Sequence, residues 1–255
     1  MERVAQGRVA LQMYTVRQDQ AKDFRGTLRK VAEMGYPAVE FAGYGGLGAE
    51  ELRGLLGELN LTAAGTHTGL DALEKDFAGV VAFHHTLGAR FVTVPSLPGN
   101  RYTRDEAGFR QAAKDLGAMG ACLAAEGLAL GYHNHDFEFF QVDGRHGLDL
   151  LYEATDPAHL RAELDVFWAK KGGVDPAAYM RKLGARCSLV HIKDMGPDGS
   201  FAEVGTGSID FPSIFAAGEA VGTEWYIVEQ DSCRERPPLE AVQLSLENLR
   251  RWGRV

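Results

Sequence analysis

The sequence is poor in cysteine and contains no long apolar run. Its three cysteines, Cys122, Cys187 and Cys233, are an odd number without C-x-x-C spacing, which excludes a disulfide framework and a cysteine-built zinc knuckle. This use of cysteine is typical of a reducing compartment, and we expect a cytoplasmic protein. No stretch reaches the ~18 consecutive apolar residues of a membrane-spanning helix. Residues 1–8 also lack the apolar core of a signal peptide.

Positive charge is scarce as well. The chain carries 27 Lys and Arg against 35 Asp and Glu, a formal net charge of −8, and no run of Lys or Arg is longer than two residues. A surface of this sign repels the phosphate backbone of nucleic acids. We therefore expect neither a nucleic acid nor a membrane as partner.

What the sequence does contain is a regular alternation of two kinds of segment. Eight short apolar or β-branched segments are typical of strands covered on both faces; they span 8–16, 38–43, 61–67, 90–95, 128–134, 160–166, 187–194 and 224–230. Between them, apolar residues recur at a spacing of three to four, which predicts amphipathic helices over 23–35, 50–60, 73–88 and 105–127.

Strict alternation of strands and helices predicts a parallel sheet. Eight units of about 32 residues match the size of a (β/α)8 TIM barrel. No linker or low-complexity tract interrupts them, so we expect a single domain over residues 1–255. A doubly wound open sheet is the alternative, but the first strand–helix turn, residues 14–17, lacks the glycine fingerprint of that fold.

Six of the eight predicted strands end on a side chain that binds metals or transfers protons. These residues are Glu40, His67, His133 with His135, Asp165, His191 with Lys193, and Glu229. Because the chemistry of a parallel barrel lies at the carboxyl ends of its strands, we expect these side chains to converge on one rim. A mixed nitrogen and oxygen set suits a divalent ion such as Mn²⁺, Co²⁺, Zn²⁺, Fe²⁺ or Mg²⁺; its members here are His133, Asp165, His191 and Glu229.

Several of these residues have a structural alternative. Asp165 is also in position to cap the helix that follows it, and His191 fits a buried core histidine whose polar atoms are satisfied. Glu229 precedes Gln230 and Asp231 and fits the edge of a solvated loop. The sequence leaves both interpretations open for each of the three.

A glycine-rich loop, residues 205–208, precedes a predicted helix that starts near Phe211. Free N–H groups at such a place bind anions. The loop is equally well explained as a turn in which Ser208 or Asp210 caps the helix, and we favour this second interpretation.

The strand-end motifs, taken in order, resemble those of the sugar phosphate isomerase/epimerase superfamily, the xylose isomerase-like TIM barrels. The matching segments cover essentially the whole chain; they are QMYTVR (12–17), GTHTGL (65–70), YHNHDFEF (132–139), ELDVFWAKKGGVDP (163–176), HIKD (191–194), EVGTGSIDF (203–211) and VEQD (228–231). The resemblance implies a divalent metal held by residues of strands five to eight. Asp165, His191 and Glu229 match the last three positions, whereas His133 stands where the family usually has Glu.

The resemblance further implies a metal-dependent isomerase or epimerase that acts on a sugar, a sugar phosphate or a polyol ketone through an enediolate. Glu229, with His133 or His135, would transfer protons, and Lys193 would offer its charge to the enediolate. Residues expected to contact this small-molecule carbohydrate are His67, Glu40, Glu138 and Trp168, with Phe137 and Phe139 as further apolar walls.

Two alternatives to this function stay open. A dehydratase or lyase acting on an inosose or a keto-sugar glycoside would use the same metal and the same proton abstraction. A non-catalytic sugar- or metal-binding barrel would abstract no proton, and His133 at the main catalytic position allows that outcome. The DNA-repair endonuclease branch of the superfamily is excluded, since Trp168 stands where that branch has a further histidine ligand. The assembly is open between a homodimer and a homotetramer.

Overall fold

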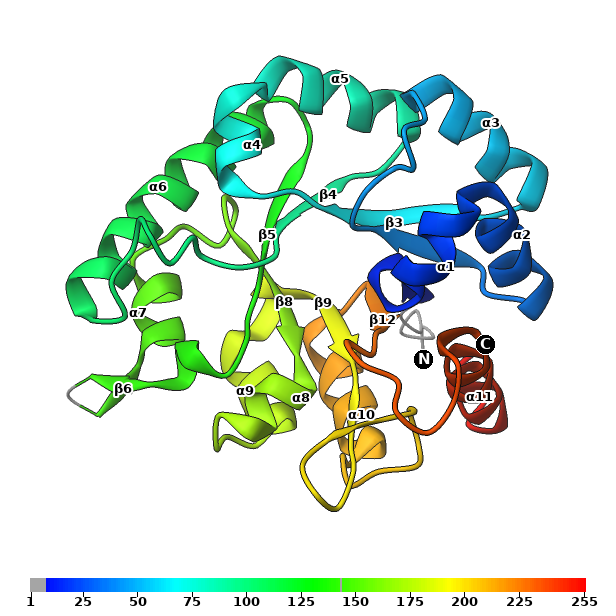
Figure 1. The fold of residues 1–255 in the computed structure, drawn as a ribbon. Helices are drawn as coiled ribbons and strands as arrows, with labels where there is room; N and C mark the ends of the chain where they lie inside the picture. Colours follow the sequence, from blue (N-terminus) through cyan, green and yellow to red (C-terminus); the bar gives the residue numbers. More distant parts are fainter. Residues whose placement is uncertain (1–7, 143) are drawn as a thin grey trace, which may run out of the picture.

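The computed structural model describes residues 8–142 and 144–255. Eight parallel strands close into a barrel in the order β1-β12-β9-β8-β5-β4-β3-β2. They are β1 (Arg8–Gln12), β2 (Ala38–Phe41), β3 (Thr62–His67), β4 (Phe91–Val94), β5 (Ala129–His133), β8 (Arg161–Asp165), β9 (Cys187–Ile192) and β12 (Trp225–Val228). Each lies within one of the eight segments expected to be strands, and the predicted TIM barrel is confirmed (Figure 1).

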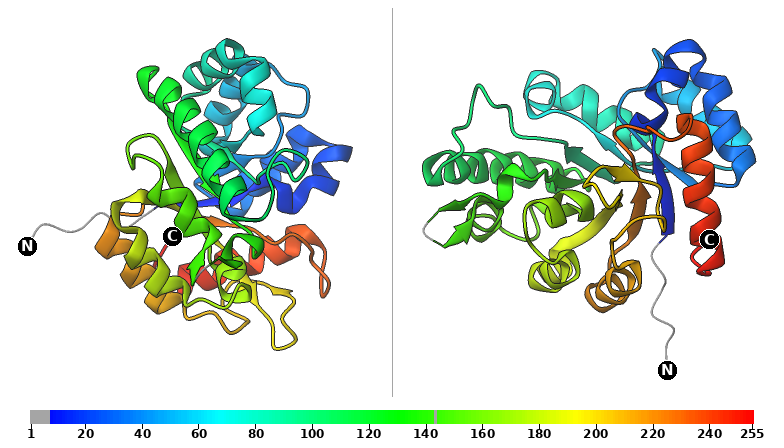
Figure 2. Two further views of the ribbon diagram at one scale, coloured as in Figure 1. Left: turned by 90° about the vertical axis from the view of Figure 1, so that its left-hand side faces the viewer. Right: turned by 60° about the horizontal axis from the view of Figure 1, so that its bottom comes forward.

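The helices surround the strands on the outside (Figure 2). They are α1 (Arg17–Lys22), α2 (Phe24–Met34), α3 (Ala49–Leu59), α4 (Leu70–Lys75), α5 (Phe77–Leu87), α6 (Glu106–Ala125), α7 (Gly147–Glu153), α8 (Val166–Lys171), α9 (Pro176–Leu183), α10 (Phe211–Val221) and α11 (Pro238–Arg251). The prediction of a single helix over 73–88 is wrong, because the helix is interrupted at Asp76. The side chain of Asp76 accepts a hydrogen bond from the Gly79 N–H and so starts α5 as a new helix. None of the described helices is long and apolar enough to cross a membrane.

Two short antiparallel hairpins extend from the barrel. One consists of β6 (Gln141–Val142) and β7 (Arg145–His146), and the other of β10 (Asp194–Met195) and β11 (Phe201–Ala202). Both follow the carboxyl end of a barrel strand, β5 and β9 respectively. They therefore belong to the end of the barrel at which the predicted site residues lie.

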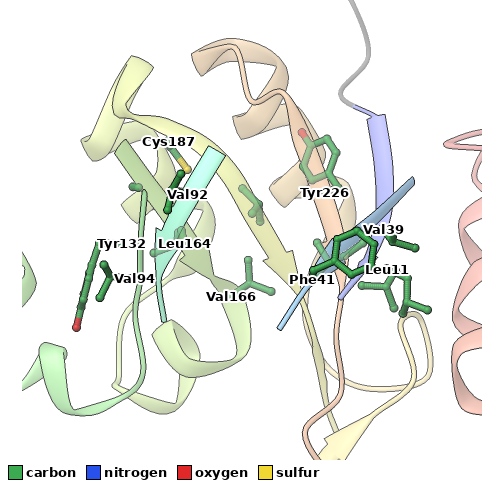
Figure 3. Close-up of a cluster of buried hydrophobic side chains, with 14 of the residues drawn as sticks. Leu11, Val39, Phe41, Val92, Val94, Tyr132, Leu164, Val166, Cys187 and Tyr226 are labelled. Carbon is green, nitrogen blue, oxygen red and sulfur yellow. The ribbon is translucent and has the colours of Figure 1, made fainter. Parts of the chain in front are cut away.

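The main hydrophobic core lies between the strands and the helices. Successive residues of a strand point to opposite faces, so Leu11 on β1 and Val39 on β2 point outward toward this core. Figure 3 shows them with other buried side chains such as Phe41 and Leu164. Each fully buried aliphatic or aromatic side chain of this kind stabilises the fold by about 1.5–3 kcal/mol. All six residues of β9 are buried, as expected for a strand covered on both faces.

The side chains inside the barrel form two layers of opposite character. Toward the amino ends of the strands lies an apolar layer of Ala10, Ala38, Ala64, Phe91, Leu189, Trp225 and Ile227. Toward the carboxyl ends lies a polar layer of Gln12, Glu40, Thr93, Glu163 and His191, all fully buried. On four strands the two layers are only two residues apart, as with Leu189 and His191. The polar layer forms the base of the functional site.

The glycine-rich loop does not offer free N–H groups to an anion. The N–H groups of Gly205, Gly207 and Ile209 all donate to the carboxylate of Asp194, at 2.8–3.0 Å. Asp210 caps α10 by accepting a hydrogen bond from the Ser213 N–H. The capped turn is therefore confirmed and the anion site is not supported, because Asp194 already occupies the donors.

Candidate active site

A cavity of about 480 Å³ opens above the polar layer at the carboxyl ends of the strands. Its lining residues are Tyr14, Ala42, His67, Pro95, Ser96, His133, His135, Lys193, Glu229 and Asp231. Five of the residues expected to contact substrate or transfer protons thus share one cavity. The roles of the individual residues remain predictions, but their side chains converge at the carboxyl ends of the strands, as the barrel geometry predicts.

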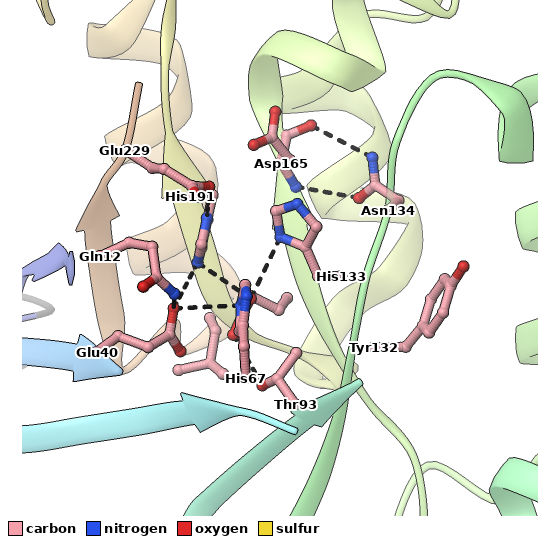
Figure 4. Close-up of polar contacts among 12 residues, drawn as sticks. Gln12, Glu40, His67, Thr93, Tyr132, His133, Asn134, Asp165, His191 and Glu229 are labelled. Atoms are coloured by element: carbon pink, nitrogen blue, oxygen red, sulfur yellow. Dashed lines mark hydrogen bonds and ion pairs between the residues drawn. The ribbon is translucent and has the colours of Figure 1, made fainter. Parts of the chain in front are cut away.

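His191 lies at the centre of the buried contacts below this cavity (Figure 4). Its Nδ1 lies 2.7 Å from Oε2 of Glu229, and its Nε2 lies 2.8 Å from Oε2 of Glu40 and 3.0 Å from Oε1 of Glu163. Burial disfavours an imidazolium, but the three carboxylates together outweigh burial and raise the pKa of His191 well above its usual value.

Glu163 is a member of the site that the sequence analysis did not identify. Its Oε1 lies 2.6 Å from Nε2 of His67 and 3.3 Å from Nδ1 of His133. Its Oε2 accepts a hydrogen bond of 2.8 Å from Oγ1 of Thr93. The available signal was strand parity: Glu163 stands two residues before Asp165, so the two side chains point to the same face.

The pKa values of Glu163 and Glu40 are shifted in opposite directions. Burial raises the pKa of Glu163, but His191 and His67 outweigh burial and hold it well below its usual range. For Glu40, burial and the neighbouring carboxylate of Glu163 raise the pKa. Glu40 lies beneath the cavity rather than on its wall, since it is fully buried and accepts a hydrogen bond from Nε2 of Gln12. Its predicted direct contact with substrate therefore finds no support.

Lys193 is surrounded by carboxylates. Its Nζ lies 2.7 Å from Oε2 of Glu229, 3.0 Å from Oδ1 of Asp231 and 3.1 Å from Oδ2 of Asp165. Burial opposes its charge, but the three carboxylates outweigh burial and raise the pKa of Lys193. The side chain is 1% exposed; its Nζ donates a hydrogen bond to Oδ1 of Asp231 and forms ion pairs with Glu229 and Asp165. Lys193 also lines the cavity, so its direct action on the substrate stays a prediction.

Asp165 uses its two oxygens for different purposes. Oδ1 accepts a hydrogen bond of 2.8 Å from the Trp168 N–H and caps α8, so the structural interpretation of this residue is confirmed. Oδ2 is buried and accepts no hydrogen bond, although the Lys193 ammonium lies 3.1 Å away. Burial raises the pKa of Asp165 to about 6. One oxygen of this carboxylate is therefore left for a ligand.

His133 and His135 provide neutral imidazoles with unused nitrogen atoms. The Nδ1 atoms of both are buried and make no hydrogen bond, and the two ring centroids lie 5.2 Å apart. Burial lowers the pKa of His133 well below its usual value and lowers that of His135 to about 4. Both rings are thus uncharged near neutral pH, the state in which imidazole binds a metal.

Glu138 and Trp168 do not line the cavity. Oε1 of Glu138 accepts a hydrogen bond of 2.5 Å from the Tyr132 hydroxyl, and Oε2 accepts one of 2.9 Å from the His135 N–H. Because both oxygens are used, Glu138 positions the segment that carries His133 and His135, and its predicted contact with substrate finds no support. Trp168 lies beside His135, with ring centroids 5.3 Å apart.

The two phenylalanines expected as apolar walls are also absent from the cavity lining. Phe139 packs against Tyr179, with ring centroids 5.2 Å apart, as part of the core. Phe137 stacks on His135, with centroids 6.1 Å apart.

The donor atoms of the site fit a divalent ion. In each of two overlapping sets of four residues, one donor atom from every residue lies within 4.8 Å of the others. One is the expected set of His133, Asp165, His191 and Glu229, and the other consists of His67, His133, Glu163 and His191. Buried polar atoms without a hydrogen bond occur here at Nδ1 of His133 and Oδ2 of Asp165, and an ion would satisfy such atoms.

Comparison with known proteins agrees with this architecture. The model of the xylose isomerase-like TIM barrel family matches residues 28–252. An inosose dehydratase of Geobacillus kaustophilus is 25% identical over 246 residues, which cover 80% of this chain and 79% of that protein. An inosose dehydratase of Clostridium beijerinckii is 26% identical over 190 residues, which cover 62% of this chain and 63% of that protein, less than two thirds of its length.

Among solved structures, a sugar phosphate isomerase/epimerase from Parabacteroides distasonis has a TM-score of 0.85 at 25% identity. The superposition covers 95% of this chain and 97% of that chain.

Proposed function

The chain belongs to the xylose isomerase-like TIM barrel family, and on that premise we propose that it is a divalent-metal-dependent enzyme that removes a proton next to the carbonyl group of an uncharged cyclitol or sugar ketone. The observation that carries this proposal is the Glu229 carboxylate at the wall of a 480 Å³ cavity, beside three imidazoles and above the candidate metal ligands. The relatives and structural neighbours described above are enzymes, dehydratases and an isomerase/epimerase.

The lining of the cavity favours a substrate without a phosphate or carboxylate group. In residues 8–142 and 144–255, Lys193 is the one Lys or Arg that lines the cavity, and three carboxylates already surround its ammonium group. Recognition of an anionic group requires an available cation or several free N–H groups. The cavity volume falls in the range of small-molecule sites, about 300–1,000 Å³. A neutral six-carbon ring or chain satisfies both conditions.

Glu229 is the base in this proposal. Burial raises its pKa, but Lys193 and His191 outweigh burial and hold the pKa well below its usual range, so the carboxylate is ionised at neutral pH. The contacts with His191 and Lys193 both go to Oε2. We assign Oε1, to which no described residue donates, as the atom that takes the proton. His67 and His135 would hydrogen-bond the hydroxyl groups of the substrate from other parts of the lining.

A divalent ion in such a site supplies Lewis-acid polarisation of the carbonyl oxygen, which acidifies the neighbouring C–H group. His133 and His191 belong to both candidate ligand sets, and carboxylates complete each set. The ion prefers neutral imidazole, and the low pKa of His133 keeps that ring uncharged near neutral pH.

Dehydration is the outcome that the relatives favour, since both relatives described above are inosose dehydratases. In that reaction the electron pair left on carbon forms a double bond and expels the hydroxyl group of the next carbon. The proton held by Glu229 goes to the departing hydroxyl, which leaves as water, and Glu229 is ionised again.

The structure from Parabacteroides distasonis favours a second candidate, isomerisation or epimerisation. In that case the proton returns to a carbon atom of the same ketone and no water is lost.

Product analysis tests the proposal. The protein is incubated with an inosose, and separately with a panel of ketohexoses, in the presence of Mn²⁺, Co²⁺ or Zn²⁺, and products are identified by NMR. We expect loss of water from the inosose, and no product from the Glu229→Gln variant. Conversion of a ketose to its isomer without loss of water would favour the second candidate, and no turnover of any neutral ketone would refute the proposal.

A further inference from the structure

A second cavity, of about 370 Å³, adjoins the one that contains the proposed base. We call it the side cavity, and the 480 Å³ cavity the main cavity. Both are lined by Ala42, which follows β2, and by His67, the last residue of β3. We propose that the side cavity binds a second ring of the substrate, which is then a neutral ketone joined to an uncharged sugar ring by a glycosidic bond. This inference rests on the proposed function and extends its substrate from one ring to two.

The size of the main cavity leaves the side cavity free for a further group. Small-molecule sites occupy about 300–1,000 Å³, so the main cavity by itself is sufficient for a six-carbon ketone. The side chain of His67, which is 10% exposed, lies at the boundary of the two cavities. A substrate that extends past His67 would therefore occupy both.

The lining of the side cavity favours an uncharged group. All its lining residues lie between positions 42 and 84, and among them is no lysine or arginine. Asp76 is part of the lining, and its carboxylate already accepts a hydrogen bond from the Gly79 N–H at the start of α5. Recognition of a phosphate or carboxylate group requires an available cation or several free N–H groups. An anionic second group is therefore disfavoured.

Two aromatic residues give the side cavity an apolar wall. Tyr44 and Phe83 both line it, and their rings stack with centroids 4.2 Å apart and planes inclined by 30°. Tyr44 also contacts the buried ring of Phe41, with centroids 6.1 Å apart. These contacts hold the pair in place as a rigid surface. The C–H face of a sugar ring is apolar and packs well on aromatic rings of this kind.

A directed chain of hydrogen bonds ends at Thr68 in the same cavity. Burial lowers the pKa of His84, so its ring is neutral. Nδ1 of His84 lies 2.7 Å from the carbonyl oxygen of Val80, which can only accept, so Nδ1 donates and Nε2 accepts. Nε2 therefore receives the proton of Thr66 Oγ1, 2.7 Å away. Thr66 Oγ1 in turn accepts from Thr68 Oγ1 at 3.2 Å, which leaves the lone pairs of the Thr68 oxygen for a ligand.

The aromatic wall and the Thr68 acceptor together define the ligand chemistry. A sugar ring has an apolar face and hydroxyl groups at its edge, and one such hydroxyl group can donate to Thr68. A purely apolar ring would displace water from Thr68 without replacing its hydrogen bond. The side cavity thus combines an apolar wall with a few placed polar groups, as small-molecule sites generally do.

A glycine in the lining allows the side cavity to be blocked. Gly69 precedes α4 with a φ of −63°, and a Cβ at this position meets no atom within 4 Å. Gly69→Leu therefore adds a side chain to the cavity without a clash. Gly48→Leu is the matched control: Gly48 precedes α3 with a φ of −72°, its Cβ also meets no atom, and it lines neither cavity. The cost of leucine at a helix cap is common to both variants, and thermal unfolding verifies that each is folded.

Binding of one-ring and two-ring ketones tests the inference. Affinities are measured by isothermal titration calorimetry with Mn²⁺ present, in the Glu229→Gln background, so that the proposed reaction does not consume the ligand. The one-ring probe is methyl glucoside oxidised to its 3-ketone, and the two-ring probes are trehalose, maltose and cellobiose oxidised in the same way. We expect at least one two-ring ketone to bind about tenfold more tightly than the one-ring ketone. Gly69→Leu should remove this preference, and Gly48→Leu should retain it.

Phe83→Ala provides a second test, because it removes half of the aromatic wall. Its control is Phe77→Ala, since Phe77 is another partly buried phenylalanine of α5 and lies outside the lining. Equal affinity for one-ring and two-ring ketones, or a preference that survives Gly69→Leu, would overturn the inference and leave the proposed function intact. Binding of neither kind of ketone would refute the proposed function itself, and the inference with it.

Discussion

The apolar and polar layers inside the barrel lie on the same strands. The apolar layer stabilises the fold, whereas the polar layer forms the base of the candidate active site. On β9, Leu189 belongs to the apolar layer and His191, two residues later, to the polar layer. On β2 the same step leads from Ala38 to Glu40. Both layers are equally buried, so solvent exposure does not account for the difference.

The energetic terms of the two layers differ in sign. Burial of Leu189 and its neighbours contributes favourably to folding, because apolar surface is removed from water. Burial of Glu40 and Glu163 is unfavourable unless their charges are compensated. A fold keeps such a layer where its chemistry is needed, and the cavity lies directly above it. The comparison teaches that stability and function are separated by one inward-pointing position on β1, β2, β4 and β9.

The largest expected effect is on catalysis, from a substitution at the wall of the cavity above the polar layer. Glu229→Gln removes the proposed base and keeps the shape of the side chain, so we expect kcat to fall by about 10²–10⁴-fold. The free energy of unfolding should change little, because Lys193 retains Asp165 and Asp231 as partners. Steady-state kinetics and urea unfolding measure the two quantities.

Glu224→Gln is the matched control for this variant, because Glu224 precedes the amino end of the same strand, β12, and forms an exposed ion pair with Arg90. It should leave kcat unchanged. Equal kcat values in Glu224→Gln and Glu229→Gln would remove the assigned role of Glu229.

The reverse pattern is expected in the apolar layer. Leu189→Ala deletes part of a fully buried side chain and should lower the free energy of unfolding by about 2–5 kcal/mol. The kcat of the folded variant should stay close to that of the wild type, since Leu189 does not line the cavity. A fall in kcat comparable to that of Glu229→Gln would show that the two layers are not separable.

A substitution of Glu138 tests whether a buried carboxylate outside both layers lowers the free energy of unfolding. Burial raises its pKa to about 7, above the value of 4.5 of an exposed glutamate. Between these pH values the folded protein holds a proton that the unfolded chain releases. The contribution of this group to stability is therefore fully present below about pH 4.5 and is lost as the pH rises through about 7.

Glu138→Gln should remove this loss. Relative to the wild type, the variant should gain stability from about pH 5 to about pH 8, by at most about 3 kcal/mol, since one pKa unit corresponds to about 1.4 kcal/mol. Urea unfolding over this pH range measures the difference. Parallel pH profiles of the two proteins would contradict the raised pKa.

The smallest effect concerns the space that Gly131 leaves for Thr93. Gly131→Ala places a Cβ 2.6 Å from Oγ1 of Thr93 and forces that side chain to move. We expect a loss of stability of about 1 kcal/mol, because the movement disturbs the buried hydrogen bond from Thr93 to Glu163. Gly54→Ala is the control: its Cβ meets no atom within 4 Å in the middle of α3, and it should stabilise the protein slightly. Equal effects of the two substitutions would show that Gly131 has no special role.

Much of the fold was predictable from the sequence, because each barrel strand lies in a short apolar segment and α2, α3 and α6 each match a segment with helical spacing of apolar residues. The broken helix at Asp76 was not, since both halves fit one helical pattern and only the cap separates them. The membership in the xylose isomerase-like family, predicted from motifs such as HIKD, is confirmed.

The site was predictable in part. Strand ends indicated His133, Asp165, His191 and Glu229, and the structure brings their donor atoms within 4.8 Å. Glu163 was missed because it stands inside a strand segment rather than at its end. The engagement of Lys193 with three carboxylates was also beyond the sequence, because those carboxylates come from the ends of two different strands and a following loop.

Exchange of the substrate's α proton with solvent tests the central claim most directly. A neutral inosose or ketose that binds the protein is followed by NMR in D₂O with wild-type protein, first metal-free after chelation and then with one equivalent of Zn²⁺ or Co²⁺ restored. The account predicts exchange of the proton next to the carbonyl group only when the ion is present. Exchange at the same rate in the metal-free protein, or none with the ion restored, would contradict it.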